Sequence, residues 1–237
     1  MKRAKGLSKR RHTKPPSHKV VISVIQQKGG VGKTTLSVHL AHMIADLRPK
    51  WNVIVADADP QQSARQWVER GISHGHTAVS AVAIAGDGEG KALRKELQEL
   101  EADVVVIDLP PAIESISLRA ALYADIMLVP VGASPLDIEA AQAAVNVCQE
   151  AMDLDPRKQM ILVPSRVRQG TASARELRPV LESWGQVSEA TLSLRVAYSD
   201  AAVSGEGIQS YAPRSDAYRE ISLLTREILT IIENREE

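Results

Sequence analysis

The sequence predicts an α/β fold with a doubly wound, mostly parallel β-sheet flanked by helices. Short runs of Val, Ile and Leu alternate along the chain with longer amphipathic segments, which is the pattern of strands joined by crossover helices. These runs are almost continuously apolar, as expected for strands that are covered on both faces. A chain of 237 residues with 44% hydrophobic residues can bury the core of one such domain.

Six apolar runs are expected to form strands: residues 20–25, 53–56, 79–85, 104–107, 126–131 and 160–163. Helices are expected between them, among them residues 36–47, a helix beginning near Pro60, and a helix that runs from a turn at residues 86–88 through Leu100. Near the C-terminus, apolar residues recur at helical spacing and predict a helix packed against the body: Ile221, Leu224, Ile228 and Ile231.

The formal net charge is zero, but the charges are segregated. Residues 1–19 contain eight lysines and arginines and no acidic residue. Such a basic, Pro-containing stretch cannot bury a core, so residues 1–19 are predicted to be a disordered N-terminal arm and residues 20–237 the folded domain. The arm could contact nucleic-acid phosphates without sequence preference. The alternative is a tail that only increases solubility.

Composition excludes several classes of protein. No apolar run approaches the roughly 18 residues of a membrane span, and the N-terminus lacks the apolar region of a signal peptide. The single cysteine, Cys148, excludes an internal disulfide and a Cys-based metal or cluster site. Val145 and Met152 lie at helical spacing from it, so Cys148 is predicted to be a buried apolar residue. We therefore expect a cytoplasmic protein.

A glycine-rich segment, Lys28-Gly-Gly-Val-Gly-Lys-Thr-Thr35, follows the first apolar run and precedes a helix. This order of strand, loop and helix is that of a P-loop, G-x-x-x-x-G-K-[ST]. The first glycine of that pattern is replaced by Gln27, and Lys28 is an additional cation. The alternative, a glycine-rich turn with two solvated lysines, explains neither the order of the elements nor the spacing.

Each residue of this loop has an expected role in binding a nucleotide. Gly29, Gly30, Val31 and Gly32 present backbone N–H groups to phosphate oxygens, at a helix N-terminus that favours an anion. Lys33 is placed for the β- and γ-phosphates, Thr34 for Mg²⁺, and Thr35 for a further phosphate oxygen. Lys28 precedes the turn of the loop, so its ammonium can serve a nucleotide held by another subunit, as an arginine finger does in trans.

Lys28 to Thr35 resemble the deviant Walker A motif of the ParA/MinD superfamily of ATPases, in which paired lysines mark ATP-dependent dimers. Residues 53–61, VIVADADPQ, are similar to its second motif, and residues 104–111, VVVIDLPP, to its Walker B strand. The resemblance covers about residues 19–232. Residues 133–137, ASPLD, and the short chain look most like the small plasmid-type ParA proteins.

The resemblance assigns roles to three carboxylates that follow predicted strands. Asp57 and Asp108 would support Mg²⁺ together with Thr34, and Asp59 would orient the attacking water, with Lys28 and Lys33 as the other catalytic residues. Two structural alternatives remain: Asp108 as a turn residue, and Asp59 as a helix N-cap before Pro60. Few strong groups surround the water, so hydrolysis of ATP to ADP and phosphate should be weak without a partner.

The resemblance also implies ATP-dependent homodimers that bind double-stranded DNA without sequence preference. The candidate DNA contacts are Arg168, Arg175, Arg195, Arg214 and Arg219. Acidic residues are interspersed among them, so a solvated surface is an equal alternative for each. Arg166 follows the predicted strand at 160–164 and lies either near the adenine or on the DNA-binding face. The near absence of aromatic residues disfavours a reader of single strands.

Three classes of function compete. The first, which we favour, is a nucleoid-associated ATPase that partitions or positions a plasmid, chromosome region or bacterial organelle with a ParB-like or cargo-adaptor protein. The second is a MinD-like ATPase at the membrane, but the acidic C-terminus (ENREE) is unsuited to an anionic surface, so no stable membrane association is expected. The third is a metabolic or metal-delivery ATPase; the latter would need a Cys pair that the chain lacks.

Overall fold

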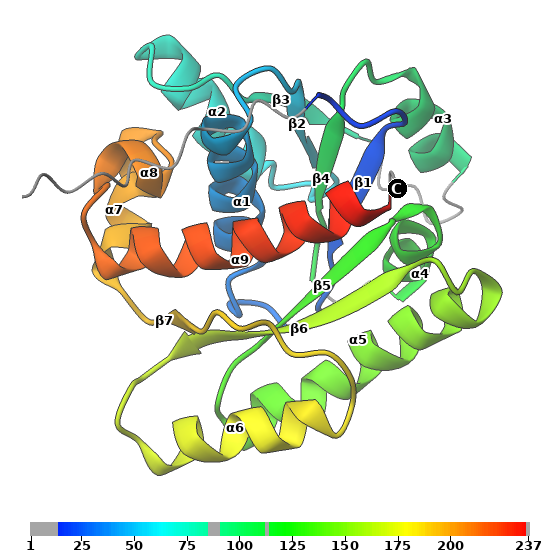
Figure 1. Ribbon diagram of the computed structural model, residues 1–237, viewed down its shortest axis with the longest axis vertical. Helices are drawn as coiled ribbons and strands as arrows, with labels where there is room; N and C mark the ends of the chain where they lie inside the picture. The colour runs from blue at the N-terminus through cyan, green and yellow to red at the C-terminus, as the bar shows by residue number, and fades with distance from the viewer. Residues whose placement is uncertain (1–13, 85–90, 112–113, 236–237) are drawn as a thin grey trace, which may run out of the picture.

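A computed structural model describes residues 14–84, 91–111 and 114–235 (Figure 1). Within these residues, seven parallel strands form one sheet in the order β3-β2-β4-β1-β5-β6-β7. The chain moves from β1 toward one edge of the sheet, returns with β4, and then moves toward the other edge. This is the doubly wound α/β fold that the sequence predicts.

The strands are β1 Val20–Val24, β2 Val53–Asp57, β3 Ser80–Ala83, β4 Val104–Asp108, β5 Ile126–Val131, β6 Gln159–Val167 and β7 Leu192–Ser193. The helices are α1 Lys33–Leu47, α2 Ser63–Ser73, α3 Lys91–Glu99, α4 Glu114–Tyr123, α5 Pro135–Leu154, α6 Ala172–Glu182, α7 Val196–Ser204, α8 Ile208–Tyr211 and α9 Asp216–Asn234. All six predicted strands are present, with small differences at their ends. The short edge strand β7 was not predicted, because two residues leave no periodicity to detect.

Helices cover both faces of the sheet (Figure 1). Alternate strand residues pack into two cores, because successive side chains of a strand point to opposite faces. One core joins the sheet to α1, α2 and α7–α9, and the other joins it to α3–α6. Cys148 is fully buried in the second core, as predicted, and burial raises the pKa of its thiol to about 12.

Two residues of the predicted arm form hydrogen bonds with the folded domain. The Lys19 ammonium donates to the carbonyl oxygen of Leu97 at 2.6 Å, near the C-terminal end of α3. The Trp51 indole N–H donates to the carbonyl oxygen of Lys14 at 3.1 Å. Lys14 and Lys19, in the C-terminal part of the predicted arm, therefore contact the domain; residues 1–13 lie outside the described residues.

The C-terminal helix α9 packs its apolar face on α1, as predicted, with Ile221, Leu224 and Ile228 buried and Ile231 partly buried. Arg48, which follows α1, pairs with Glu233, and Arg235 pairs with Asp125 at 3.0 Å, so two ion pairs hold the C-terminal end of α9. None of the described helices has the combination of length and apolarity needed to cross a bilayer.

Ile228→Ala should lower the free energy of unfolding by about 2–5 kcal/mol, because it removes a fully buried side chain of α9 and leaves a cavity. Leu223→Ala on the same helix is the matched control, since that side chain is 42% exposed and its loss should cost about 0.5 kcal/mol or less. Urea denaturation of both variants measures the difference. Equal losses would contradict the packing described for α9.

Candidate nucleotide-binding site

The glycine-rich loop joins β1 to α1 at the carboxyl edge of the sheet, where open α/β sheets bind ligands. Gly30 and Gly32 have φ angles of +76° and +97°, which a side chain would disfavour. Gly32 is the N-cap of α1 and provides no side-chain hydrogen bond. The backbone N–H groups of the first turn are therefore available to an anion, and the helix dipole favours one there.

The two lysines of the loop have different environments. Lys33 is 7% exposed, and its ammonium donates to the carbonyl oxygen of Lys28 across the loop at 3.2 Å. Burial lowers the pKa of Lys33, while the charges of Asp108 and Asp59 partly oppose this shift. The Lys33 side chain is thus folded back over its own loop.

Lys28 points away from this loop. Its ammonium lies 2.6 Å from Oδ1 of Asp137, in the first turn of α5. The other carboxylate oxygen of Asp137 accepts from the Ser134 hydroxyl at 2.6 Å. Burial alone would raise the pKa of Asp137, but the hydrogen bonds from Lys28 and Ser134 outweigh it and lower the pKa. The additional lysine is therefore held by α5, at the edge of the site.

Asp108 links the end of β4 to the start of α1. Its carboxylate accepts from the Thr34 hydroxyl at 2.7 Å and from the Ser37 hydroxyl at 3.1 Å. Asp57 lies beside it in the register of β2 and β4. Burial raises the pKa of Asp108 to about 7; the hydrogen bond from Thr34 opposes this shift and the Asp57 charge adds to it. This set of hydroxyl and carboxylate oxygens is the type that Mg²⁺ prefers.

Asp57 shapes the loop that carries Asp59. Its two carboxylate oxygens accept from the backbone N–H groups of Asp59 at 3.0 Å and Arg65 at 2.9 Å. Burial raises the pKa of Asp57, and these two hydrogen bonds oppose the shift. The alternative interpretation of Asp59 as a helix N-cap is wrong, because α2 begins at Ser63 with Gln62 as its N-cap.

Asp59 instead closes a turn, in which its side chain accepts from the Gln61 N–H at 2.9 Å. The helix begins three residues later than the sequence predicts because this turn, and the left-handed Gln62 (φ +51°), come first. The Asp59 carboxylate is only partly buried and lies close enough to Lys33 to influence its pKa. It is therefore at the rim of the glycine-rich loop.

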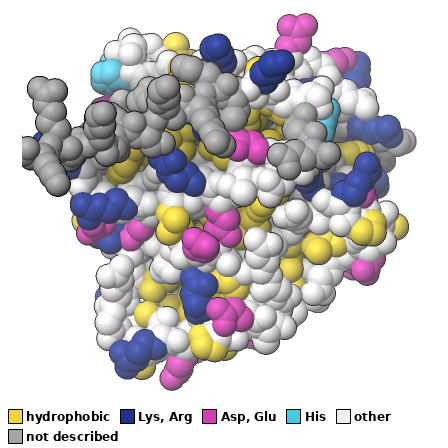
Figure 2. Space-filling view, in the orientation of Figure 1, with side chains coloured by type: hydrophobic (Ala, Val, Ile, Leu, Met, Phe, Trp, Pro, Cys, Tyr) yellow, Lys and Arg dark blue, Asp and Glu magenta, His cyan; other side chains and the backbone are white. Residues whose placement is uncertain are grey.

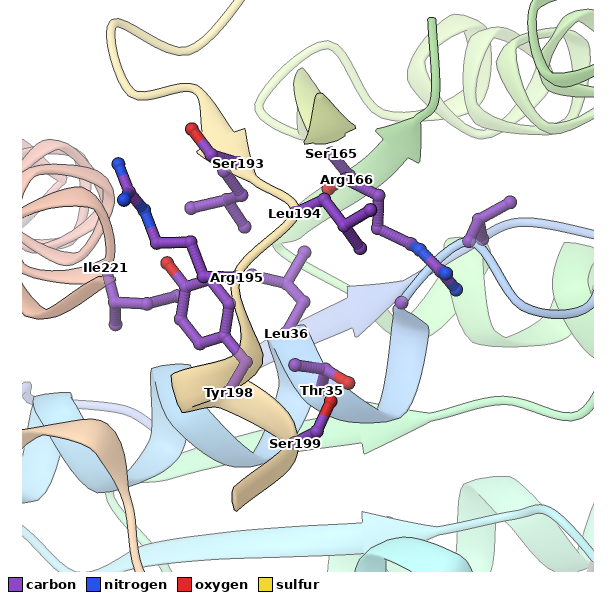
Figure 3. Close-up of a pocket in the computed structure, with 13 residues that line it drawn as sticks. Thr35, Leu36, Ser165, Arg166, Ser193, Leu194, Arg195, Tyr198, Ser199 and Ile221 are labelled. Carbon is purple, nitrogen blue, oxygen red and sulfur yellow. The ribbon is translucent and has the colours of Figure 1, made fainter. Parts of the chain in front are cut away.

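Arg166 does not follow a strand, as the sequence suggested, but lies inside β6. It has a φ of +53°, at an irregularity in the pairing of β6 with β7. A residue other than glycine rarely adopts this conformation, and such strain is concentrated at functional sites. The guanidinium extends over the glycine-rich loop and donates to the Gly30 carbonyl oxygen (Figure 3).

Beside the loop lies a cavity of about 140 Å³, roughly ten times the space that one water molecule needs. The glycine-rich loop, α1, β6, β7, α7 and α9 line it (Figure 3). The lining residues are Val31, Gly32, Thr35, Leu36, Ser165, Arg166, Leu192, Ser193, Leu194, Arg195, Tyr198, Ser199 and Ile221. Its mixed apolar and hydroxyl lining, next to a phosphate-type loop, suits a flat heterocycle with polar edges.

The five arginines that were candidate DNA contacts fall in two regions. Arg168 and Arg175 lie near the start of α6 and are exposed; Arg214 and Arg219 lie near the start of α9 and are exposed. Arg195 is the poorest candidate, because it pairs with Glu220 at 2.8 Å and with Asp216 at 3.3 Å. Figure 2 shows Lys and Arg mixed with Asp and Glu on this face.

Sequence reasoning missed several residues of the site: Ser37, Gln62, Asp137, Tyr198 and Glu220. A signal existed for Ser37, which follows Lys33 by one helical turn and so faces the same side. Asp137 lies in the ASPLD segment, but its partner Lys28 is far away in the sequence. Glu220 could not be found, because its contacts depend on how α9 packs.

Comparison with known proteins agrees with this geometry. The family model "CobQ/CobB/MinD/ParA nucleotide binding domain" matches residues 22–208. "Maintenance of carboxysome distribution protein A" of Halothiobacillus neapolitanus is 28% identical over 211 residues, 88% of this chain and 95% of that protein. "Chromosome-partitioning ATPase Soj" of Thermus thermophilus is 26% identical over 241 residues, covering 90% and 96%.

A solved structure is also similar: a putative plasmid partition protein of Borrelia burgdorferi bound to AMPPNP. It superimposes with a TM-score of 0.70 at 16% identity and covers 90% of this chain and 99% of that one. At this identity the likeness shows the fold. The chain belongs to the CobQ/CobB/MinD/ParA nucleotide-binding family, and its fold is that of the P-loop ATPases of this family. Its resemblance to ParA-type proteins is confirmed.

Asp108 should make the stability of the nucleotide-free protein depend on pH. Burial raises its pKa from the ordinary value of about 3.8 to about 7 in the folded chain, so the folded state binds the proton more tightly. The resulting stabilisation is complete below about pH 4 and is lost as pH rises to about 7, with a slope of at most about 1.4 kcal/mol per pH unit.

Asp108→Asn should remove this pH-dependent contribution to the free energy of unfolding. Chemical denaturation between pH 5 and pH 8, without nucleotide or Mg²⁺, measures the difference in unfolding free energy between the variant and the wild-type protein. That difference should change in favour of the variant as pH rises. A difference independent of pH would show that the Asp108 carboxylate is not perturbed.

Proposed function

We propose that this protein is an ATP-dependent dimerising ATPase that partitions or positions a cargo on the nucleoid. ATP with Mg²⁺ occupies the site of each subunit, and the two subunits pair across their nucleotides. The dimer binds double-stranded DNA without sequence preference, and a ParB-like or cargo-adaptor protein stimulates hydrolysis and release. Relatives named for carboxysome distribution and chromosome partitioning support a role in positioning.

The position of Lys28 carries this proposal. Lys33 already provides the ammonium that covers its own loop, whereas Lys28 is outside that loop, paired with Asp137. An ammonium at the edge of the site, about one-third exposed, can reach a triphosphate that another subunit presents. The Lys28 ammonium would then leave the Asp137 carboxylate for the more highly charged phosphate of the other subunit. The stronger attraction would favour the dimer.

The residues around the loop fit a metal–triphosphate complex. Thr34 and Asp108 would hold Mg²⁺, with Asp57 supporting Asp108 from the neighbouring strand. When bound, Mg²⁺ neutralises part of the phosphate charge. The triphosphate would be oriented by the backbone N–H groups of residues 29–35. The Lys33 ammonium would neutralise a further part of its charge. The cavity between α1 and β7 would take the nucleoside base, with Arg166 over the phosphates at its edge.

Hydrolysis depends on Asp59, which we assign to orienting the attacking water. Its carboxylate is at the rim of the loop and is partly buried. Leu109, which follows Asp108, cannot act as a base. Because the chain itself supplies few groups to activate water, hydrolysis to ADP and phosphate should be slow in isolation and should be accelerated by the partner.

Duplex phosphates would contact the exposed arginines Arg168, Arg175, Arg214 and Arg219. The basic residues 1–13, outside the described residues, would add nonspecific affinity. A membrane-associated cycle like that of MinD is disfavoured, because the apolar face of α9 is buried against the body. We therefore place the protein in the cytoplasm, on the nucleoid.

Lys28→Ala should leave nucleotide binding to the monomer within about threefold of the wild type, because Lys28 lies outside the loop of its own subunit. It should abolish the dimer that forms with a nonhydrolysable ATP analogue, as measured by analytical ultracentrifugation. Lys33→Ala is the control: it should weaken nucleotide binding by at least about tenfold through loss of a buried charge partner. An unchanged dimer fraction in Lys28→Ala would refute the role in trans.

Arg214→Glu should weaken binding of the ATP-bound protein to duplex DNA by about tenfold and reduce the salt dependence of binding by about one counterion. Arg157→Glu is the matched control. It makes the same charge change at an exposed residue, but beside Arg235 at the C-terminal end of α9, whereas Arg214 precedes the N-terminal end of that helix. Anisotropy titrations over a range of salt measure both. Equal weakening of DNA binding by the two substitutions would show that Arg214 is not a specific part of the DNA-binding surface. Sedimentation of the ATP-bound protein with anionic vesicles in preference to DNA would favour a membrane role.

A further inference from the structure

The wall of the cavity opposite α1 has little support from the sheet. It consists of β7 and the first turn of α7, residues 192–199. β7 has two residues, and its pairing with β6 is irregular between Ser165 and Val167. Such a short edge strand contributes few hydrogen bonds of its own. Its position must depend on contacts from outside the sheet.

Many of those contacts come from one carboxylate on α9, beside hydrogen bonds from the Gln169 amide to the Ser193 hydroxyl at 3.0 Å and from the Tyr198 hydroxyl to the Ala217 carbonyl oxygen at 3.1 Å. Glu220 accepts from the Ser193 N–H at 3.0 Å and the Ser193 hydroxyl at 2.8 Å. It also accepts from Nε and Nη2 of Arg195 at 3.0 and 2.8 Å, and from the Tyr198 hydroxyl at 2.9 Å. All three of these residues line the cavity. The Glu220 side chain is 12% exposed, so solvent screens these hydrogen bonds little.

The same carboxylate connects the wall to the glycine-rich loop through α1. The Tyr198 ring lies 5.2 Å from the His39 ring of α1, and burial raises the pKa of the Tyr198 hydroxyl, so it stays a hydrogen-bond donor. Arg195, which also lines the cavity, is ion-paired with Glu220. The wall is therefore fixed relative to the helix that begins at Lys33.

From this arrangement we infer that Glu220 is a positioning residue for the nucleoside part of the nucleotide. It touches neither phosphate nor base. It holds Ser193 and Tyr198 at the distance from α1 that a purine needs, so that the base contributes to affinity in addition to the phosphates. The inference rests on the proposed binding of ATP in this cavity.

The test compares two ligands that share the phosphate site. ATP uses both the loop and the cavity, whereas inorganic tripolyphosphate uses the loop alone. Glu220→Ala should weaken binding of Mg-ATP by about tenfold, because several charge-assisted hydrogen bonds that fix the wall are lost. It should change binding of Mg-tripolyphosphate by less than about twofold. Glu220→Gln, which keeps the volume of the side chain, should show a smaller loss in the same direction.

Glu227→Ala is the matched control on the same helix. Glu227 accepts from the Glu189 N–H at 3.1 Å and does not line the cavity, so the ratio of the two affinities should stay at the wild-type value. Equal weakening of both ligands by Glu220→Ala would indicate general destabilisation and overturn the inference, as would an unchanged affinity for ATP. Failure of the wild-type protein to bind Mg-ATP would instead overturn the proposed function.

Discussion

The parallel pairing of β4 with both β1 and β2 is the constraint on which the site depends. This register places Asp57 beside Asp108 and places Asp108 beneath the first turn of α1, where Thr34 and Ser37 donate to it. A buried carboxylate with a neighbouring carboxylate is costly for the empty protein, as the raised pKa of Asp108 records. That cost is the physical reason to expect a cation at this point, because a divalent ion would offset both charges.

The sequence predicted the fold well because each buried strand is an uninterrupted apolar run, and because the glycine-rich loop requires a strand before it and a helix after it. The phosphate side of the site follows from the same local patterns, since Lys33, Thr34 and Asp108 belong to contiguous motifs. Three features could not be predicted: the short strand β7, the bulge that holds Arg166, and the bond from Asp137 to Lys28. Each depends on tertiary contacts between residues distant in the sequence, which leave no local period or spacing. The misplaced start of α2 has a different cause, because Asp59–Pro60 fits a helix cap as well as it fits the turn that forms.

Lys28 and Arg195 illustrate that the role of a charged residue can be assigned only when its partners in the structure are known. Both are basic residues that sequence patterns marked for an external ligand. Arg195 makes ion pairs to two acidic residues of α9, one of which also binds Ser193 and Tyr198, so removing it from this network would disturb a cavity wall. Lys28 makes a single pair at the edge of the site, with a partner that keeps a second hydrogen bond from Ser134. Asp137 therefore remains hydrogen-bonded when Lys28 leaves. Breaking the Lys28 ion pair should cost less free energy than breaking the two ion pairs of Arg195, so Lys28 is the more available of the two for contact with another molecule.

Helix α1 connects the two halves of the site. Its N-terminus forms part of the glycine-rich loop, and its second turn carries His39, whose ring contacts Trp67 of α2 at 5.0 Å and Tyr198 of α7 at 5.2 Å. Burial lowers the pKa of His39 to about 3, so this contact is between neutral rings and does not change across the physiological pH range. The loop that carries Asp59 leads into α2, and the cavity wall at β7 leads into α7. Because both helices pack on the same neutral side chain, the loop that carries Asp59 and the cavity wall at residues 192–199 are held in one geometry by packing rather than by charge.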